Sequence, residues 1–395
     1  MNSKISIIKI LPVLFAFFVM GFCDIVGITS DYVQEAFGWS NTMTGFVPSM
    51  VFIWFLFLSI PIGIKMDSWG RKNTVLLSMA ITVIGMALPL IVYNSVNCMV
   101  AYALLGIGNC ILQVSLNPLL SNVVTNNKLL TSSLTVGQVV KAISSMVGPY
   151  IVLFAVNYFG GGENTNWYYV FPILGAITLL SAGWLIMTPI PREEKSIVEK
   201  GSSFFDTMSL LKDKTILLLF LGICFVVGVD VATNFISSKL MAARFAWDKE
   251  ATASAPQVYF LSRTVGALLG AYLLTKIDAV KYYKANIIAC IVATLLLAFF
   301  EVEMLNIICI GAIGFLCSCI FPIIYSMAVQ VRPEKANQIS GFLITAIAGG
   351  AIVSPVLGAA IDLFGFTGGS FVILICVLYL TFCAFRTTES KSFNL

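Results

Sequence analysis

Four ionisable side chains lie deep inside apolar segments of the sequence: Asp24, Lys141, Asp230 and Arg263. A charged group in the hydrocarbon core of a membrane is costly where it faces lipid, so such groups point into the protein or into a wet cavity. There they pair with one another, relay protons, or bind ions and charged solutes. The chemistry that these residues predict is therefore cation relay or recognition of a polar solute.

Histidine is absent from the chain, which removes the commonest metal ligand and the side chain that titrates near neutral pH without perturbation. Any proton coupling must therefore use carboxylates. The ten cysteines lie mostly inside apolar segments and show no paired spacing. We expect that the protein has no metal site and no cofactor. We also expect that it is not an enzyme, because no catalytic triad or phosphate-binding loop is present in the sequence.

Amide side chains recur at helical spacing in two apolar segments. Asn109, Gln113 and Asn117 follow one another four residues apart, which makes one polar stripe along a helix face. Gln138 and Lys141 share a face of the next segment. Because amides both donate to and accept from hydroxyl groups, we interpret Gln113, Asn117 and Gln138 as cavity residues that bind a solute. The alternative is that amides hold helices together, which we favour for Asn109.

The elements that position these residues are membrane-spanning helices. Hydrophobic residues make up 59% of the chain, charged residues 11%, and the mean hydropathy is +0.96. A helix needs about 20 apolar residues to cross the hydrocarbon core. Twelve segments are predicted to do so: 9–30, 44–65, 74–94, 97–121, 132–157, 168–189, 214–236, 256–275, 285–301, 304–329, 338–361 and 368–386. The predicted fold class is an all-α membrane protein.

Internal repetition divides these helices into two sets of six. The spacing from Asp24 to Asp230 equals the spacing from Pro149 to Pro355. Many secondary transporters consist of two such halves. We predict two pseudo-symmetric six-helix bundles, 1–190 and 214–395, joined by a cytoplasmic linker at 191–213.

Lysine and arginine concentrate in alternate loops, which predicts that both termini are cytoplasmic. Only Lys239, Arg244 and Lys249 then lie on the outer side. The net charge of +4 follows from this topology and gives no reason to expect nucleic acid as a partner. We expect a monomer in a plasma membrane, the bacterial inner membrane, with the lipid bilayer, a small solute and a coupling cation as its partners.

The loop after the second predicted span reads "GIKMDSWGRK" and resembles the G-x-x-x-D-[RK]-x-G-R-[RK] signature of the major facilitator superfamily. Ser68 departs from the signature, and the matching positions are Gly63, Asp67, Gly70, Arg71 and Lys72. We interpret Asp67, Gly70, Arg71 and Lys72 as a conformational latch, in which a tight turn holds charges that pair and separate as the halves move. The alternative is that Arg71 and Lys72 only anchor the topology. The resemblance implies the twelve-helix major facilitator fold.

A narrower resemblance is carried by "DYVQEAF", "QVSLNPLL", "IFPIIYSMAVQ" and "ITAIAGGAIVSPVLGAAID". These segments look like the fucose permease and glucose/galactose permease family of sugar–cation symporters. The resemblance implies monosaccharide uptake coupled to protons or sodium, and Tyr325 of the third segment joins the candidate substrate contacts. Two positions depart from the family: its helix-four glutamate is Gln113 here, and its helix-one aspartate falls at Gly27. Its proton coupling therefore cannot be transferred residue by residue.

Together, these patterns predict a secondary active transporter that imports a monosaccharide by proton or sodium symport with alternating access. Asp24 and Asp230 are the candidate coupling carboxylates. The candidate substrate-binding residues are Gln113, Asn117, Gln138, Lys141, Asn234, Arg263 and Tyr325. An organic-anion symporter that holds a sugar acid is the first alternative, and a membrane solute sensor without transport is the second.

The two cationic side chains leave alternatives open. Lys141 could pair permanently with Asp24, pair with it only during part of the transport cycle, or bind an anionic substrate. Arg263 could have a structural role, pairing with Asp230 or capping backbone carbonyls, or it could contact the substrate.

Overall fold

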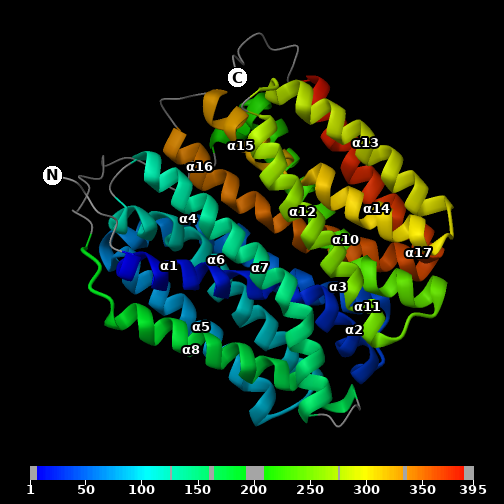
Figure 1. Ribbon diagram of the computed structural model, residues 1–395, viewed down its shortest axis with the longest axis horizontal. Helices are drawn as coiled ribbons and strands as arrows, with labels where there is room; N and C mark the ends of the chain where they lie inside the picture. Colours follow the sequence, from blue (N-terminus) through cyan, green and yellow to red (C-terminus); the bar gives the residue numbers. More distant parts are fainter. Residues whose placement is uncertain are drawn as a thin grey trace. The chain divides into compact units, whose positions relative to one another are not determined.

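The computed structural model describes residues 7–124, 127–159, 164–192, 209–274, 276–331 and 336–386. Within these ranges every regular element is a helix (Figure 1). The predicted all-α fold is therefore confirmed. The helices group into two compact units, the first made of Met1–Ile25 and Phe57–Gly201, the second of Val26–Leu56 and Ser202–Leu395.

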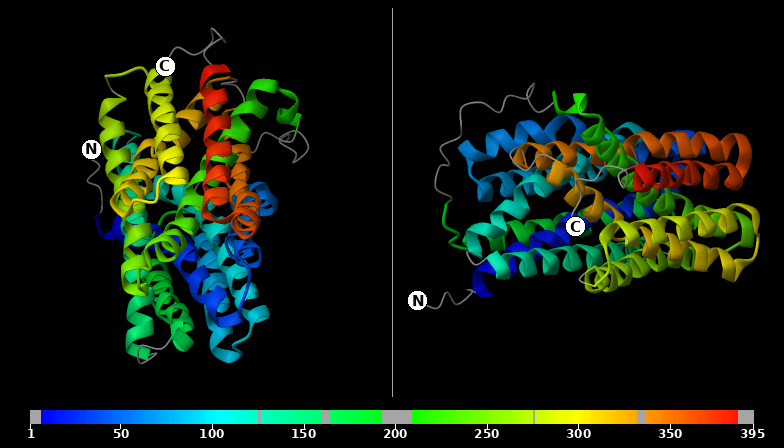
Figure 2. Two further views of the ribbon diagram at one scale, coloured as in Figure 1. Left: turned by 90° about the vertical axis from the view of Figure 1, so that its right-hand side faces the viewer. Right: turned by 90° about the horizontal axis from the view of Figure 1, so that it is seen from above.

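The first unit contains the helices of the N-terminal part of the chain, apart from the segment assigned to the second unit. Its helices are α1 (Ile7–Met20), the 3-10 helix η1 (Gly21–Ile25), most of α4 (Trp54–Trp69), α5 (Arg71–Ile91), α6 (Ser95–Val123), α7 (Asn127–Phe159), the 3-10 helix η2 (Asn164–Tyr169) and α8 (Val170–Met187). In this unit α5 packs along α6 and α8, and α1 packs against α6, α7 and α8 (Figure 2).

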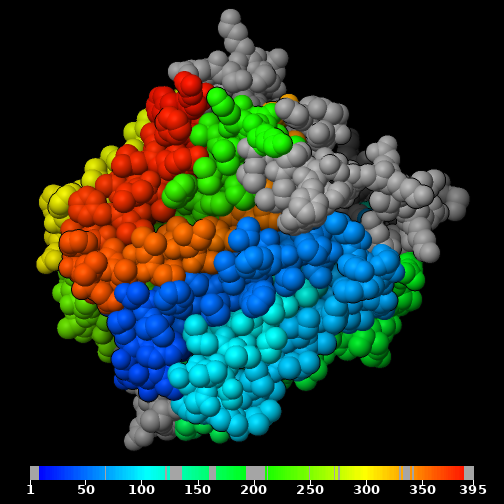
Figure 3. All heavy atoms as spheres, turned by 180° about the vertical axis from the view of Figure 1, so that it is seen from behind, coloured from blue at the N-terminus to red at the C-terminus, as the bar shows by residue number. Residues whose placement is uncertain are grey.

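The second unit combines two early helices with all the later ones. Its helices are α2 (Val26–Phe37), α3 (Asn41–Phe52), η3 (Ser209–Lys212), α10 (Lys214–Phe245), α11 (Lys249–Thr252), α12 (Ser254–Leu273), α13 (Ala279–Phe299), α14 (Glu303–Cys317), α15 (Ile320–Val331), α16 (Ala336–Thr345), η5 (Ala346–Ala348) and α17 (Gly349–Arg386). Here α17 packs against α10, α13 and α3, and α12 packs against α14. Figure 3 shows α3, in blue, lying along the orange part of α17.

Ten segments of the described chain are long and apolar enough to cross a membrane. The last of them, Phe342–Arg386, covers two predicted spans, because the chain turns at Gly365, where φ is 67°. The predicted span 256–275 corresponds to α12, whose polar side chains, Arg263 among them, keep it outside the ten. When Phe342–Arg386 is counted as two spans and α12 is added, each of the twelve predicted spans corresponds to a helix.

The predicted first span is a broken helix. It is formed by α1, η1 and α2, and the 3-10 segment lies between two α-helical parts. A 3-10 turn inside a span interrupts the regular α-helical hydrogen bonding, so the carbonyls around it need other donors. This break places Asp24 beside backbone groups that lack the regular hydrogen bonds of an α-helix.

The predicted domain boundaries remain predictions. Contacts group Val26–Leu56 with the later helices, although the sequence places this segment in the bundle 1–190. Much of the predicted linker, residues 193–208, lies outside the described residues.

Candidate functional site

The first polar site is built around Asp24, in the 3-10 break. The Ser145 hydroxyl of α7 donates to Asp24 Oδ2 over 2.6 Å. A Cβ atom added at Gly21 would lie 2.6 Å from the Lys141 carbonyl oxygen, so the break packs directly on α7. A Cβ atom at Gly148 would likewise lie 2.5 Å from Ile25. The glycines allow this close crossing, and the crossing brings the hydroxyl of α7 to the carboxylate.

A buried amide satisfies the backbone at the break. Asn109 of α6 donates through Nδ2 to the Met20 carbonyl oxygen over 2.9 Å. Gln113, one turn later on α6, donates through Nε2 to Asn109 Oδ1 over 2.6 Å. Asn109 is buried and Gln113 half-buried. Two residues of the predicted polar stripe, Asn109 and Gln113, thus form a hydrogen-bonded pair. Asn109, the more buried of the two, joins α6 to the end of α1 through its hydrogen bond to the Met20 carbonyl oxygen.

Lys141 lies on α7, one turn before Ser145, and is half-buried. Among the described residues, no ion pair joins the Lys141 ammonium group to Asp24 or to another carboxylate. The pairing of Lys141 with Asp24 that the sequence suggested therefore remains a prediction. The neighbouring candidates Gln138 of α7 and Asn117 of α6 are exposed, and their role in substrate binding remains a prediction.

The second polar site is built around Asp230 of α10. Arg263 of α12 lies with Nη2 2.6 Å from Asp230 Oδ2. The hydroxyl group of Tyr259, also on α12, donates to Asp230 Oδ1. Tyr259 is fully buried, and a Cβ atom at Gly314 of α14 would lie 2.6 Å from its carbonyl oxygen. Of the two alternatives for Arg263, pairing with Asp230 is the one that this structure contains.

Two further candidate substrate contacts also lie in the second unit. Asn234 follows Asp230 by one turn of α10 and is buried. A Cβ atom at Gly27 would lie 2.4 Å from Asn234 Oδ1, so α2 and α10 touch at this point. Tyr325 of α15 is half-buried, and its ring stacks on Phe321 with ring centroids 6.2 Å apart. Their contact with a substrate remains a prediction.

The glycine of the signature loop has a backbone that favours glycine. Gly70 has φ 87° and directly precedes α5. Other L-residues rarely adopt this conformation, which explains a glycine at the turn between α4 and α5. The side chain of Asp67 lies outside the described residues, so its part in the predicted latch is untested.

The basic residues of the loop bind the ends of two helices. Arg71 donates through Nη1 to the Pro118 carbonyl oxygen over 3.0 Å and to Asn122 Oδ1 over 2.6 Å, near the end of α6. Lys72 donates through Nζ to the Thr188 carbonyl oxygen over 2.8 Å, just after α8. Carbonyl groups at a helix C-terminus carry partial negative charge and favour cations. Both side chains thus join helices within the first unit, a role beyond anchoring the topology.

The sequence profile of the Major Facilitator Superfamily matches residues 12–355. The chain belongs to the Major Facilitator Superfamily. It is 26% identical over 387 residues to the "Glucose/galactose transporter" of Brucella abortus biovar 1, an alignment that covers 93% of this chain and 90% of that protein. The crystal structure of the E. coli fucose:proton symporter FucP has the same fold, with a TM-score of 0.70 at 18% identity over 97% of this chain and 99% of that chain.

A further relative matches over a shorter region. The "Putative glucose/galactose transporter" of Helicobacter pylori strain 26695 is 28% identical over 218 residues, 54% of this chain. In that alignment the chain spans about half the length of its relative, 52%. These relatives are transporters by name, and the chain shares the family of the Brucella protein and the fold of FucP.

Sequence reasoning missed a polar cluster that joins α2 to α10. Lys239 was placed outside the predicted span 214–236, but α10 continues to Phe245 and Lys239 is buried in it. Asp31, its ion-pair partner, was not selected as a candidate. A signal was present, because neither glycine nor proline occurs between 236 and 245 to end the helix.

Proposed function

We propose that this major facilitator chain imports a monosaccharide by cation symport with alternating access. The names of its relatives support the substrate class, because the Brucella protein is named a glucose/galactose transporter. The membership of the Major Facilitator Superfamily supports transport by two halves that move around a central site. The half-buried carboxylates Asp24 and Asp230 supply groups able to bind the coupling cation.

The observation that carries the coupling proposal is the position of Asp24 in the broken first span. Binding of a proton or a sodium ion there neutralises a carboxylate that would otherwise face low-dielectric surroundings as an anion. The Ser145 hydroxyl is a donor to the charged carboxylate and can accept from the protonated one, so it serves both states. Cation binding at Asp24 thereby lowers the electrostatic cost of closing the site around the solute.

The amide groups of α6 and α7 are suited to a hydroxylated solute. Gln113, Asn117 and Gln138 are half-buried or exposed, and each carries both donors and an acceptor. A sugar offers several hydroxyl groups, each of which can donate and accept. We assign these three amides of the first unit to the binding of sugar hydroxyl groups. Asn234 and Tyr325 stay separate candidate substrate contacts within the second unit.

Counterflow in proteoliposomes tests the proposal. Vesicles loaded with an unlabelled sugar should accumulate the same labelled sugar when the chain is present. A proton or a sodium gradient should then drive net uptake in empty vesicles, and an ionophore that dissipates the effective gradient should abolish it. Counterflow by none of the aldohexoses or 6-deoxyhexoses would contradict the substrate class, and uptake indifferent to both gradients would contradict symport.

A sugar-acid symporter is the second candidate, and Lys141 favours it. Its half-buried ammonium group is a cation inside a predicted span, and the carboxylate of an anionic solute is a suitable counter-ion for it. Arg263 is less suited, because Asp230 already holds its guanidinium group. The same counterflow experiment decides between the candidates, since exchange of hexuronates in place of neutral hexoses would select the second one.

The signature loop and the cellular setting complete the proposal. Arg71 and Lys72 bind the ends of α6 and α8, which supports a latch that keeps these cytoplasmic helix ends in register. We assign the chain to the bacterial inner membrane as a monomer with both termini cytoplasmic. Tags fused to each terminus and probed in intact and opened cells test the orientation.

A further inference from the structure

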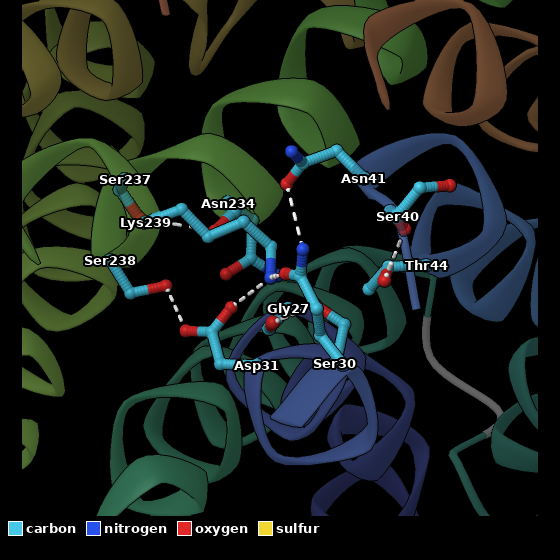
Figure 4. A network of polar contacts seen from close by, with 11 residues as sticks. Gly27, Ser30, Asp31, Ser40, Asn41, Thr44, Asn234, Ser237, Ser238 and Lys239 are labelled. Atoms are coloured by element: carbon cyan, nitrogen blue, oxygen red, sulfur yellow. Dashed lines mark hydrogen bonds and ion pairs between the residues drawn. The ribbon is translucent and has the colours of Figure 1, made fainter. Parts of the chain in front are cut away.

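A partly buried ion pair, in which the Asp31 side chain is 27% exposed, joins the segment after the first predicted span to the segment after the seventh (Figure 4). Lys239 of α10 pairs with Asp31 of α2, and its side chain is only 6% exposed. The same ammonium group donates to Gln34 Oε1 over 2.7 Å. The neighbouring Ser238 hydroxyl donates to Asp31 Oδ2 over 2.6 Å. Two charges and two polar groups are thus matched at one contact between α2 and α10.

The same chain of hydrogen bonds continues to α3 and α17. Gln34 donates through Nε2 to Asn41 Oδ1 over 3.1 Å, and Asn41 donates through Nδ2 to Asp362 Oδ1 over 2.8 Å. The Asp362 carboxylate also accepts from the backbone N–H groups of Asn41, over 3.0 Å, and Thr42, over 2.7 Å. These are the first two amides of α3, which have no partner within their own helix. A carboxylate of α17 therefore caps the positive end of α3.

Glycines bring α3 and α17 into backbone contact beside this carboxylate. A Cβ atom added at Gly358 would lie 2.1 Å from the Asn41 carbonyl oxygen. A Cβ atom at Gly45 would lie 2.6 Å from the Ser354 carbonyl oxygen. Neither position accepts a larger residue without separating the helices. The contact is therefore both polar at its end and closely packed along its length (Figure 3).

The helices joined here come from different halves of the sequence. α2 and α3 belong to the predicted bundle 1–190, whereas α10 and α17 belong to 214–395. With cytoplasmic termini, the turn between α2 and α3 lies on the outer face. Alternating access requires that these helix ends meet when the path is closed to the outside and part when it opens.

We propose that Ser238, Asp31, Lys239, Gln34, Asn41 and Asp362 form the outer gate of the transporter, here in its closed state. This inference rests on the proposed function for its requirement of alternating access. Every group of the gate is strongly hydrated when exposed, so water compensates the contacts that opening breaks. Replacing a buried ion pair by apolar residues is often neutral or stabilising, whereas removing one partner leaves an uncompensated charge. The gate should therefore respond differently to single and double substitutions.

The test measures access of a membrane-impermeant maleimide to the gate from outside intact cells. The reporter is Ser237→Cys, because Ser237 is fully buried in α10 and follows Asn234, which touches α2, by one turn. The parent chain with Ser237 retained gives the background from its ten native cysteines. No solute is present, and expression of each variant is measured with an epitope tag.

Asp31→Asn and Lys239→Met should each raise the labelling rate about tenfold, and the double variant should return it close to that of the reporter chain. Asp362→Asn should raise the rate about threefold, as expected for loss of one charge at a helix N-terminus. Asp278→Asn is the matched control, because Asp278 caps α13 by accepting from the Lys281 N–H over 2.9 Å and lies outside the gate. It should leave labelling unchanged.

Three outcomes would overturn the gate. They are equal labelling in all variants, faster labelling in the double variant than in either single one, and labelling only in inside-out vesicles. The result is separate from the proposed function, since labelling requires no sugar. Gate variants that respond as expected in a chain without sugar counterflow would leave the gate standing and contradict the substrate class. Sugar counterflow together with a labelling rate that is the same in all gate variants would leave the proposed function standing and contradict the gate.

Discussion

Asp24 and Asp230 stand at matching positions of the internal repeat, and the two units hold them in different ways. Asp24 lies in a 3-10 break, where a hydroxyl group of α7 donates to it. Asp230 lies within the continuous helix α10, where it binds the guanidinium group of Arg263 and the hydroxyl group of Tyr259. The repeat thus conserves a carboxylate in each half but surrounds it with different chemistry.

The difference assigns the two carboxylates to different tasks. A guanidinium group 2.6 Å from Asp230 repels a second cation, so proton or sodium binding there must compete with Arg263. At Asp24 the Ser145 hydroxyl group donates to the carboxylate, and it can reorient as the carboxylate changes charge. We therefore expect coupling at Asp24 and a structural ion pair at Asp230.

The largest effect is expected for Asp24→Asn. Asparagine keeps the hydrogen bond to Ser145 but cannot be protonated or supply a carboxylate to sodium. Gradient-driven accumulation should fall until the sugar only equilibrates across the membrane, while counterflow continues. Both are measured in proteoliposomes with labelled sugar. The matched control is Asp213→Asn, which removes a carboxylate that caps the start of α10. Full accumulation by Asp24→Asn would overturn the comparison.

Asp230→Asn should mainly affect stability. Loss of the carboxylate leaves the Arg263 guanidinium group without its ion-pair partner and should lower the free energy of unfolding by about 2 kcal/mol. We place the effect below that of a fully buried pair because the Arg263 side chain is 35% exposed. The double variant Asp230→Asn with Arg263→Met should recover much of the loss. Thermal unfolding in detergent measures both, and a stable single variant that has lost coupling would reverse the assignment.

A smaller stability effect is expected for Asn109→Ala, which tests the broken span itself. The substitution removes the amide that donates to the Met20 carbonyl oxygen and accepts from Gln113. Leaving these buried groups without Asn109 should cost about 1–2 kcal/mol of unfolding free energy. Asn97→Ala is the control, at a half-buried position near the start of α6 where the amide donates to the Val92 carbonyl oxygen over 3.0 Å. Equal unfolding midpoints for the two variants would show that the break needs no support from α6.

The smallest effect is expected for Lys141→Met with a neutral sugar. A neutral sugar offers no charge to the Lys141 ammonium group, so removal of Lys141 should leave the sugar dissociation constant within about twofold. A sugar acid held by Lys141 would instead lose about 2–5 kcal/mol of binding. Calorimetry with a hexose and the matching hexuronate separates the two results. A selective loss of hexuronate binding would favour the anion symporter and move Lys141 into the substrate site.

Much of the fold could be predicted because membranes impose a simple rule on sequence. A span needs about 20 apolar residues, so twelve such segments could be located from hydropathy. The signature glycine was recognisable because its backbone conformation, φ 87° at Gly70, suits few other residues. Asp24, Asp230 and Arg263 were recognisable because ionisable groups within spans are rare and are rarely placed without function.

The sequence by itself therefore determined the helices, their number and the candidate ionisable residues, since apolar length and buried charge are properties of a segment. Only the tertiary structure decided the partners: Arg263 with Asp230, Ser145 with Asp24, and Lys239 with Asp31. Partners depend on which helix faces meet and on where each helix ends. Hydropathy averages over all faces of a helix, so it contains no information on which face meets which.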